Sequence, residues 1–125
     1  MKKSLISGLK GTRDFYPDDQ RQRQALLSML RGTIERYGYQ EYDAPVLEPL
    51  ELYAAKSSAE IIERQSYVFD DRNGDRLVVR PEMTPSLARM VAAKQRELPP
   101  ILRWYSFPEC WRYERPQKGR LRNFL

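Results

Sequence analysis

The sequence has no histidine and a single cysteine among its 125 residues. One cysteine cannot form an internal disulfide, and without histidine the chain lacks the usual Cys/His ligand set for zinc. We therefore expect no structural metal site. No apolar run approaches the roughly 20 residues that a membrane helix needs, so we also expect no membrane span.

Targeting and glycine-rich nucleotide motifs are missing as well. The N-terminus begins Met1-Lys2-Lys3 and lacks the apolar stretch and the cleavage site of a secretory signal. We expect the mature chain to begin near Met1 and the protein to be cytoplasmic. Because the patterns GxxxxGK[ST] and GxGxxG are absent, a nucleotide site in this chain would use a sheet and not a glycine loop at a helix start.

Length and charge limit what the chain can form. With 125 residues it is long enough for one modest domain, whose core can bury roughly two-thirds of the surface that the unfolded chain exposes. The net charge is +5, and residues 103–125 carry six cations against two carboxylates. This concentration of positive charge suits phosphate binding, although a solvated basic face is the plainer interpretation.

Hydrophobic periodicity predicts an α+β fold, in which an antiparallel sheet is flanked by a long helix and a second helix. Leu26, Leu30 and Ile34 recur every four residues, which indicates an amphipathic helix that starts at Asp18-Asp19 and stops at Gly38. Glycines and a proline interrupt any period in residues 1–17, so we expect an irregular arm that lies across another element.

The strand signals lie in the middle and last thirds of the chain. Asn73-Gly74 separates two apolar runs, Tyr67–Phe69 and Leu77–Val79, and is the pair best able to take the positive φ of a tight hairpin turn. A strand is predicted over residues 39–47, where Pro45 favours an edge position or simply a strand end. The remaining predictions are one or two short helices over 50–64, a helix over about 85–96 and a strand over 101–107.

A strand from Trp111 to Glu114 would carry the most chemistry. Alternation would place Arg112 and Glu114 on one face and the two aromatic residues on the other. A guanidinium suits a phosphate or carboxylate, and a carboxylate accepts hydrogen bonds from an amine such as that of adenine. Gly119, in the cationic turn that follows, suits close approach of the backbone to a ligand. The alternative is an ion pair on a solvated sheet.

A second candidate site lies where the hairpin meets the helix that follows it. Thr84 and Pro85 match an N-cap and a first-turn proline, so capping alone explains Thr84. The partial positive charge of a helix N-terminus repels an ammonium group. A site for a free amino acid there would need an added carboxylate, which Glu82 supplies.

Four segments, in order, resemble the histidyl-tRNA synthetases, which are class II aminoacyl-tRNA synthetases. They are GLKGTRDFYP (residues 8–17), residues 37–45, which are similar to motif 1, RPEMT (80–84), and residues 111–122, which are similar to motif 2 and include RYERPQKGR. The resemblance implies that residues 1–125 are the N-terminal portion of a class II catalytic domain. Motif 1 would span about residues 37–50, and motif 2 about 103–125, where it is incomplete.

The resemblance implies a histidine–tRNA ligase, whose partners are histidine, ATP and tRNA(His). Glu82 and Thr84 would bind the amino group of histidine. Arg112, as the catalytic residue, would bridge the histidine carboxylate and the α-phosphate of ATP. Mg²⁺ would accompany ATP, with ligands outside this chain. Met83 departs from the family pattern, because many members carry glycine there.

The resemblance also assigns roles on the ATP side and at a subunit interface. Glu114 would hold the adenine, while Arg115 and Arg120 would meet the base or the outer phosphates and approach the acceptor end of tRNA. The proline-containing strand at Pro45 implies a homodimer. Because the downstream glutamine, the histidine-specific arginine segment, motif 3 and the anticodon-binding domain are absent, we expect either a fragment of a longer synthetase or a truncated gene product. We expect the chain alone to be inactive.

Two other functions remain open. The regulatory subunit of ATP phosphoribosyltransferase is a synthetase relative that senses histidine without charging tRNA. The intact pair of Arg112 and Glu114 argues against it, because a regulator does not need residues that grip ATP. A class II synthetase for another amino acid, such as proline or threonine, is the second alternative, and the pair of Glu82 and Thr84 favours histidine over it.

Overall fold

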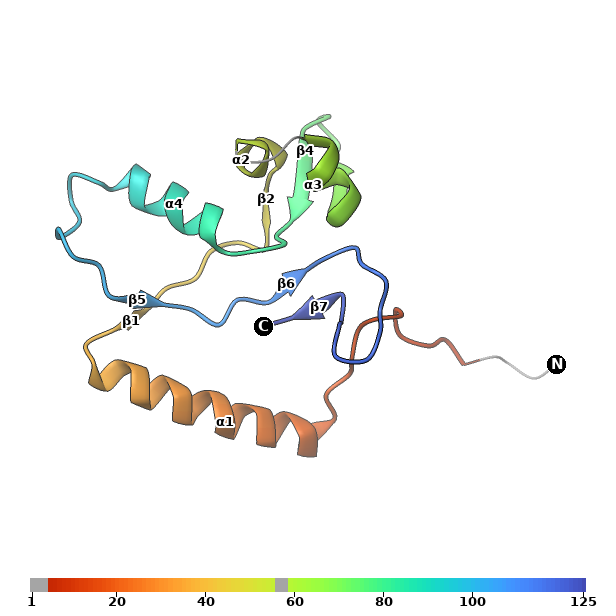
Figure 1. The fold of residues 1–125 in the computed structure, drawn as a ribbon, viewed down its shortest axis with the longest axis horizontal. Helices are drawn as coiled ribbons and strands as arrows, with labels where there is room; N and C mark the ends of the chain where they lie inside the picture. Colours follow the sequence, from red (N-terminus) through yellow and green to blue (C-terminus); the bar gives the residue numbers. More distant parts are fainter. Residues whose placement is uncertain (1–4, 56–58) are drawn as a thin grey trace.

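The computed structural model describes residues 5–55 and 59–125, which form four helices and seven short strands (Figure 1). In chain order the elements are α1 (Pro17–Arg36), β1 (Gln40–Glu41), β2 (Leu47–Pro49), α2 (Leu50–Ala54), α3 (Ala59–Gln65), β3 (Tyr67–Asp70), β4 (Arg76–Val79), α4 (Thr84–Ala93), β5 (Trp104–Tyr105), β6 (Cys110–Trp111) and β7 (Asn123–Phe124). The α+β fold class is confirmed. The sheet is divided into three small pieces, of which one, the pair β1–β5, is parallel.

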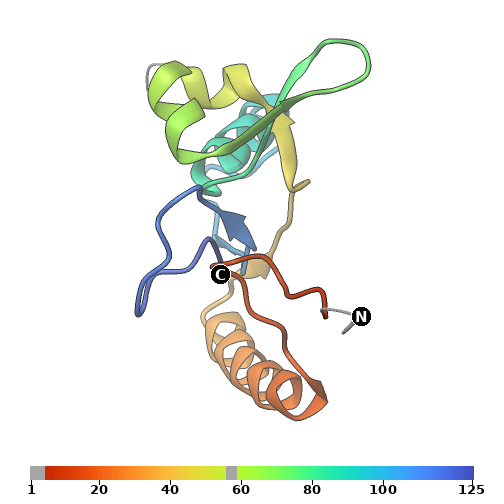
Figure 2. The same cartoon turned by 90° about the vertical axis from the view of Figure 1, so that its right-hand side faces the viewer.

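The long helix α1 forms where the sequence predicts it. Pro17 stands at its first turn with Asp18 and Asp19, which suit the positive end of the helix dipole, and Gly38 ends it with a φ of 79°. The helix lies apart from the α2–α4 layer in Figures 1 and 2 and has no buried residue of its own. Two polar contacts tie it to the β1–β5 pair, Arg31 to Glu41 and Tyr105 to Glu35.

The strand predicted over residues 39–47 is wrong in its extent. β1 ends at Glu41 and β2 begins at Leu47, so Pro45 lies in the exposed connection between them. The carbonyl of Ala44 accepts a hydrogen bond of 2.7 Å from Arg80 Nη1 instead of joining a strand ladder. The strand predicted over 101–107 is likewise reduced, to the two residues of β5.

The predicted hairpin is confirmed, but its turn differs. β3 and β4 pair antiparallel, and β2 adds to the other edge of β4. The connection runs from Asp71 to Asp75, and Gly74 alone in it has a positive φ, of 86°. Asp71 explains this form, because its Oδ1 accepts the backbone N–H groups of Asn73 and Asp75 and holds a longer loop.

Helices α2 and α3 confirm the prediction of two short helices over 50–64. The core of the described residues lies between this pair and the sheet, where Leu50, Tyr53 and Val78 are buried together. Helix α4 starts one residue earlier and ends three residues earlier than predicted. Its N-cap is Met83, so the prediction that Thr84 caps the helix is wrong: Thr84 is already the first helical residue.

The strand predicted from Trp111 to Glu114 is also wrong beyond its first residue. β6 ends at Trp111, and the N–H of Glu114 donates to the carbonyl of Arg112 at 3.0 Å, which is the tight bend of a γ-turn. The irregular arm before α1 does lie across another segment, as predicted, because the N–H of Arg122 donates to the carbonyl of Gly11. Within residues 5–55 and 59–125, no helix has the length and apolar character to cross a bilayer.

Candidate active site

Arg112 lies where three parts of the chain meet. Its backbone N–H donates to the carbonyl of Arg122 at 2.8 Å, beside the β6–β7 pair. Its side-chain Nε donates to the carbonyl of Pro81 at 3.1 Å, and its guanidinium lies 5.1 Å from the centre of the Phe124 ring. These contacts orient the guanidinium between the segment before α4 and the strands of the C-terminal hairpin.

Arg112 and Glu82 line one cleft of about 290 Å³. The other lining residues come from α3 and the segments beside it: Ile61, Ile62, Gln65, Ser66 and Pro81. The Glu82 side chain is exposed, while its backbone carbonyl accepts a hydrogen bond of 3.0 Å from the hydroxyl of the buried Tyr53. The carboxylate therefore faces solvent from a backbone position that the core fixes.

Arg112 and Glu114 line a second cleft, of about 370 Å³, together with other residues of the loop over 113–122, the cationic loop. Its other lining residues are Gly119, Arg120, Leu121 and Phe124. Glu114 and Arg120 form a two-pronged ion pair, in which Nε and Nη2 donate to the two carboxylate oxygens at 2.7 and 2.8 Å. Arg112 thus borders both clefts, with a carboxylate in each of them.

The ion pair sets the charge of the second cleft. Hydrogen bonding from Arg120 lowers the pKa of the Glu114 carboxyl below its ordinary value, against a smaller opposing effect of desolvation. Glu114 is therefore ionised at neutral pH. Each carboxylate oxygen has two lone pairs, so Glu114 keeps acceptor capacity for a ligand amine while Arg120 holds it.

Arg112 and Glu114 line a common cleft, but not because they alternate along a strand, as the sequence predicts. The γ-turn at Tyr113 brings the two side chains round to one side, and the Tyr113 ring packs edge-on against Tyr67 with the ring centres 5.4 Å apart. An ion pair between Arg112 and Glu114, the plainer interpretation of these residues, is not formed in the described chain, because the partner of Glu114 is Arg120.

The other predicted site residues lie outside the two clefts. Thr84 and Arg115 are exposed and are not among the lining residues of either cleft. Pro45 is exposed in the connection between β1 and β2. Met83 has a φ of −96°, which any L-residue adopts, so a methionine at this position does not strain the backbone.

A buried polar group beneath the site was missed by sequence reasoning. Glu48 on β2 is 3% exposed and accepts two hydrogen bonds from Arg89 of α4, at 3.0 and 2.6 Å, and one from Ser86 at 3.2 Å. The only signal in the sequence is the acidic residue between Leu47 and Pro49 in a short strand. Nothing local identifies Arg89 as its partner, because 41 residues separate them.

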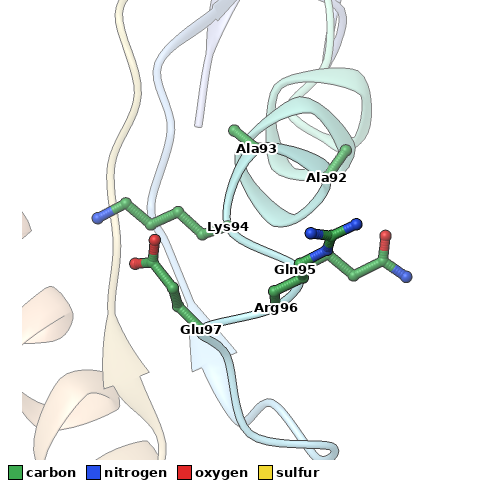
Figure 3. A pocket seen from close by; sticks show the side chains of 6 residues that line it. All are labelled: Ala92, Ala93, Lys94, Gln95, Arg96 and Glu97. Carbon is green, nitrogen blue, oxygen red and sulfur yellow. The ribbon is translucent and has the colours of Figure 1, made fainter.

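A further hollow, of about 250 Å³, lies at the C-terminal end of α4 (Figure 3). All of its lining residues belong to the single segment Ala92–Glu97, and the Gln95 side chain points away from those of Lys94 and Glu97. Because no other element contributes a side chain, this hollow offers no converging set of groups for a ligand.

The described fold matches solved structures of known enzymes. A histidyl-tRNA synthetase from Nostoc sp. PCC 7120 superposes with a TM-score of 0.80 at 25% identity, covering 96% of this chain and 27% of that one. A Bacillus halodurans structure described as an ATP phosphoribosyltransferase regulatory subunit/histidyl-tRNA synthetase also gives a TM-score of 0.80 at 25% identity, over 99% and 31% of the two chains. The fold is that of the class II aminoacyl-tRNA synthetase catalytic domain.

Sequence comparison narrows this class to one family. The sequence model of the histidyl-tRNA synthetases matches residues 11–125. A histidine–tRNA ligase from Leptospira biflexa is 52% identical over 120 residues, which are 96% of this chain and 28% of the relative. The chain belongs to the histidyl-tRNA synthetase family and spans a little more than a quarter of the length of this relative.

Proposed function

We propose that this chain supplies parts of the histidine site and of the ATP site of a histidine–tRNA ligase. The reaction has two steps, formation of histidyl-adenylate from histidine and ATP, then transfer of histidine to tRNA(His). The observation that carries the proposal is the position of Arg112 on two adjoining clefts, one with Glu82 and the other with Glu114 and Arg120. Two substrates held in these clefts would both reach one guanidinium.

The cleft with Glu82 suits the amino acid. Its carboxylate would pair with the ammonium group of histidine and offset the positive end of α4, whose first residue is Thr84. The Thr84 hydroxyl would accept a hydrogen bond from a second N–H of the same ammonium. Since Thr84 is outside the lining of the cleft, this second contact requires histidine to lie close to the start of the helix.

Arg112 would act on the reacting atoms. A carboxylate oxygen of histidine attacks the α-phosphorus of ATP, the bond from that phosphorus to the bridging oxygen breaks, and pyrophosphate leaves with the electron pair. Both reactants are anions, so their approach needs a cation between them. One guanidinium that donates to the carboxylate and to the α-phosphate supplies it, and stabilises the charge that develops at phosphorus.

The cleft with Glu114 suits the nucleotide. Glu114 would accept a hydrogen bond from the adenine amino group, and Arg115 and Arg120 would bind the base or the outer phosphates and approach the acceptor end of tRNA. Mg²⁺ would accompany ATP. Within residues 5–55 and 59–125 no cluster of three or more acidic, cysteine or histidine side chains is suited to hold a metal ion, so the proposal gives Mg²⁺ no ligand there.

The proposal extends to the setting of the whole protein. Residues 1–125 would form the N-terminal portion of the catalytic domain, with motif 1 over about 37–50 and an incomplete motif 2 over about 103–125. Pro45 and the exposed connection around it would contribute to the interface of a homodimer. The protein would act in the cytoplasm, where tRNA is charged.

A chimaeric enzyme tests the function directly. In it, this chain replaces the aligned 120 residues of the Leptospira biflexa relative, and ATP–pyrophosphate exchange is measured with histidine, proline or threonine as the amino acid. We expect exchange with histidine alone and charging of tRNA(His). Exchange with proline or threonine would favour a synthetase for another amino acid. Histidine binding without exchange, in a folded chimaera, would favour the regulatory alternative and contradict the proposal.

A further inference from the structure

The N-terminal arm and the cationic loop lie side by side. In Figures 1 and 2 the arm before α1 passes beside the segment between β6 and β7. The arm turns at residues 9–12, where the N–H and the hydroxyl of Thr12 both donate to the carbonyl of Leu9. Gly11 stands in this turn with a φ of 87°. The arm therefore presents a fixed turn, not an extended tail, to the loop over residues 113–122.

Arg122 joins the two segments through several groups. Its backbone N–H donates to the carbonyl of Gly11 at 2.8 Å, and its Nη1 to the carbonyl of Lys10 at 3.4 Å. Its Nε donates to the carbonyl of Glu114 at 2.8 Å, and its guanidinium lies 4.9 Å from the centre of the Tyr113 ring. One side chain thus contacts the arm and the start of the loop together.

Gly11 is required by the closeness of this contact. A Cβ at Gly11 would lie 2.8 Å from Cγ of Pro116 and 2.9 Å from Cγ of Arg122, which is closer than side-chain carbons approach one another. The positive φ adds a backbone preference for glycine. Pro116 and Arg122 lie on opposite limbs of the loop, so a single small residue of the arm supports both limbs.

Arg122, which the arm contacts, is itself hydrogen-bonded to residues on the ATP side of the candidate site. The carbonyl of Arg122 accepts a hydrogen bond from the backbone N–H of Arg112. The guanidinium of Arg122 donates to the carbonyl of Glu114. The Glu114 carboxylate in turn holds Arg120. The backbone carbonyl of Glu82, in the other cleft, accepts a hydrogen bond from Tyr53, and among the described residues no hydrogen bond or ion pair joins Glu82 to the arm. The arm is therefore coupled to one cleft more directly than to the other.

We propose that the turn at Gly11 is a positioning element for the cationic loop, which acts through Arg122 to hold Glu114 and Arg120 in place for ATP. This inference rests on the proposed function. Gly11 and Arg122 touch no substrate in it, and their effect is on the geometry of the groups that do. Small displacements of such groups are costly, since a misplacement of about 1 Å can lower a rate by about 100-fold.

The test uses Gly11→Ala with two matched glycine controls. Gly8→Ala alters the same arm where the nearest atoms are 4.0 Å from the added Cβ, and Gly74→Ala imposes a positive φ of 86° in open space at the β3–β4 loop. In the chimaeric enzyme we expect Gly11→Ala to raise the KM for ATP at least about tenfold and to leave the KM for histidine nearly unchanged. Arg122→Met, which keeps the apolar stem, should give the same pattern, and both controls should match the unaltered enzyme.

Hydrogen–deuterium exchange of the 125-residue chain gives a readout that needs no activity. In Gly11→Ala the amides of Arg112, Gln117, Arg120 and Arg122, which are hydrogen-bonded in and around the loop, should exchange about tenfold faster than in the Gly74→Ala control. Unchanged loop exchange together with an unchanged KM for ATP would overturn the inference, as would equal rises in the KM values for ATP and histidine. An unaltered chimaera that is inactive with histidine would refute the proposed function. Hydrogen–deuterium exchange would then decide by itself whether the arm positions the loop.

Discussion

At the scale of single residues, Arg112 is distinguished by the guanidinium N–H groups that it keeps available for ligands. One of the five N–H groups of its guanidinium is donated to the carbonyl of Pro81. Among residues 5–55 and 59–125 its two terminal nitrogens make no hydrogen bond, so they remain for ligands on the clefts that the residue borders. A planar group fixed at Nε in this way presents its outer edge in one orientation, which suits simultaneous binding of a carboxylate and a phosphate.

Arg112→Lys should separate charge from geometry. Lysine keeps the positive charge but loses the planar fork and the Nε donor to Pro81, so we expect kcat of histidine-dependent exchange in the chimaera to fall about 100- to 1,000-fold. The control is Arg103→Lys, a change at an exposed arginine of the same cationic segment. A fall of less than about tenfold at position 112 would show that a point charge suffices and would contradict the bridging role.

Glu114 gives a prediction of pH dependence. Its pKa is lowered in the folded chain by Arg120, so the ion pair stabilises the fold above the ordinary pKa of 4.5 and this contribution is lost as pH falls through the lower, folded pKa. Thermal denaturation should show Glu114→Gln slightly less stable at neutral pH, and the effect should be small because the Arg120 side chain of the pair is 54% exposed. The difference should vanish in acid. In an Arg120→Met background, Glu114→Gln should cause no further loss of stability at any pH. A loss that persists there would show that it does not arise from the ion pair.

At the scale of elements, the reliable predictions came from strong local signals. The spacing of Leu26, Leu30 and Ile34 marks α1, and its end at Gly38 follows from a conformation that glycine adopts easily. The hairpin of β3 and β4 follows from two apolar runs about a turn. Each of these signals depends on residues close together in the sequence, so a single sequence contains all the information that is needed.

Predictions that depended on distant partners were less successful. The strand around Pro45 is interrupted because Arg80, from the end of β4, binds the carbonyl of Ala44 and also that of Glu109. The relative placement of the candidate site residues was also predicted only in part. Arg112 and Glu114 do share a cleft, but a γ-turn brings them together. No local sequence pattern predicts that bend or the ion pair of Glu114 with Arg120.

The pair of Glu48 and Arg89 connects β2 to α4 and so supports the helix that begins two residues after Glu82. The two partners differ in burial: the Glu48 side chain is 3% exposed and that of Arg89 is 41% exposed. Removing the arginine would leave a buried carboxylate with Ser86 as its one remaining hydrogen-bond partner among residues 5–55 and 59–125. Neutralising the glutamate would leave a cation that water can reach. The two single changes are therefore not equivalent.

We expect Arg89→Ala to lower the free energy of unfolding by about 3 kcal/mol, near the range for an unpaired buried charge. Glu48→Gln keeps the shape and most hydrogen bonds and should cost about 1 kcal/mol. Urea denaturation of the two variants and of the double variant measures the coupling. In the double variant the penalty of the buried charge is gone, so it should be more stable than Arg89→Ala alone. An additive result would show that burial of the Glu48 charge is not the cause.

At the scale of the whole molecule, the chain has more apolar surface than its small core covers. Helix α1 has no buried residue, and the exposed fractions of Leu26, Met29 and Leu30 are 53%, 64% and 41%. The helix is joined to the rest by polar contacts of Arg31 and Tyr105 more than by packing. Side chains that line both clefts of the candidate site are exposed as well, including those of Glu82 and Arg120.

This openness leads to the last prediction, that the 125-residue chain alone will not form histidyl-adenylate. Glu82, Arg115 and Arg120 are exposed, and water at such groups weakens each charge interaction that the reaction needs. The purified chain should show no histidine-dependent ATP–pyrophosphate exchange under conditions in which the chimaera is active. Circular dichroism of the same sample would establish that the chain is folded during the assay. Exchange by the folded chain alone would mean that Arg112 and its neighbours suffice without further enclosure, and that the argument from solvent exposure is wrong.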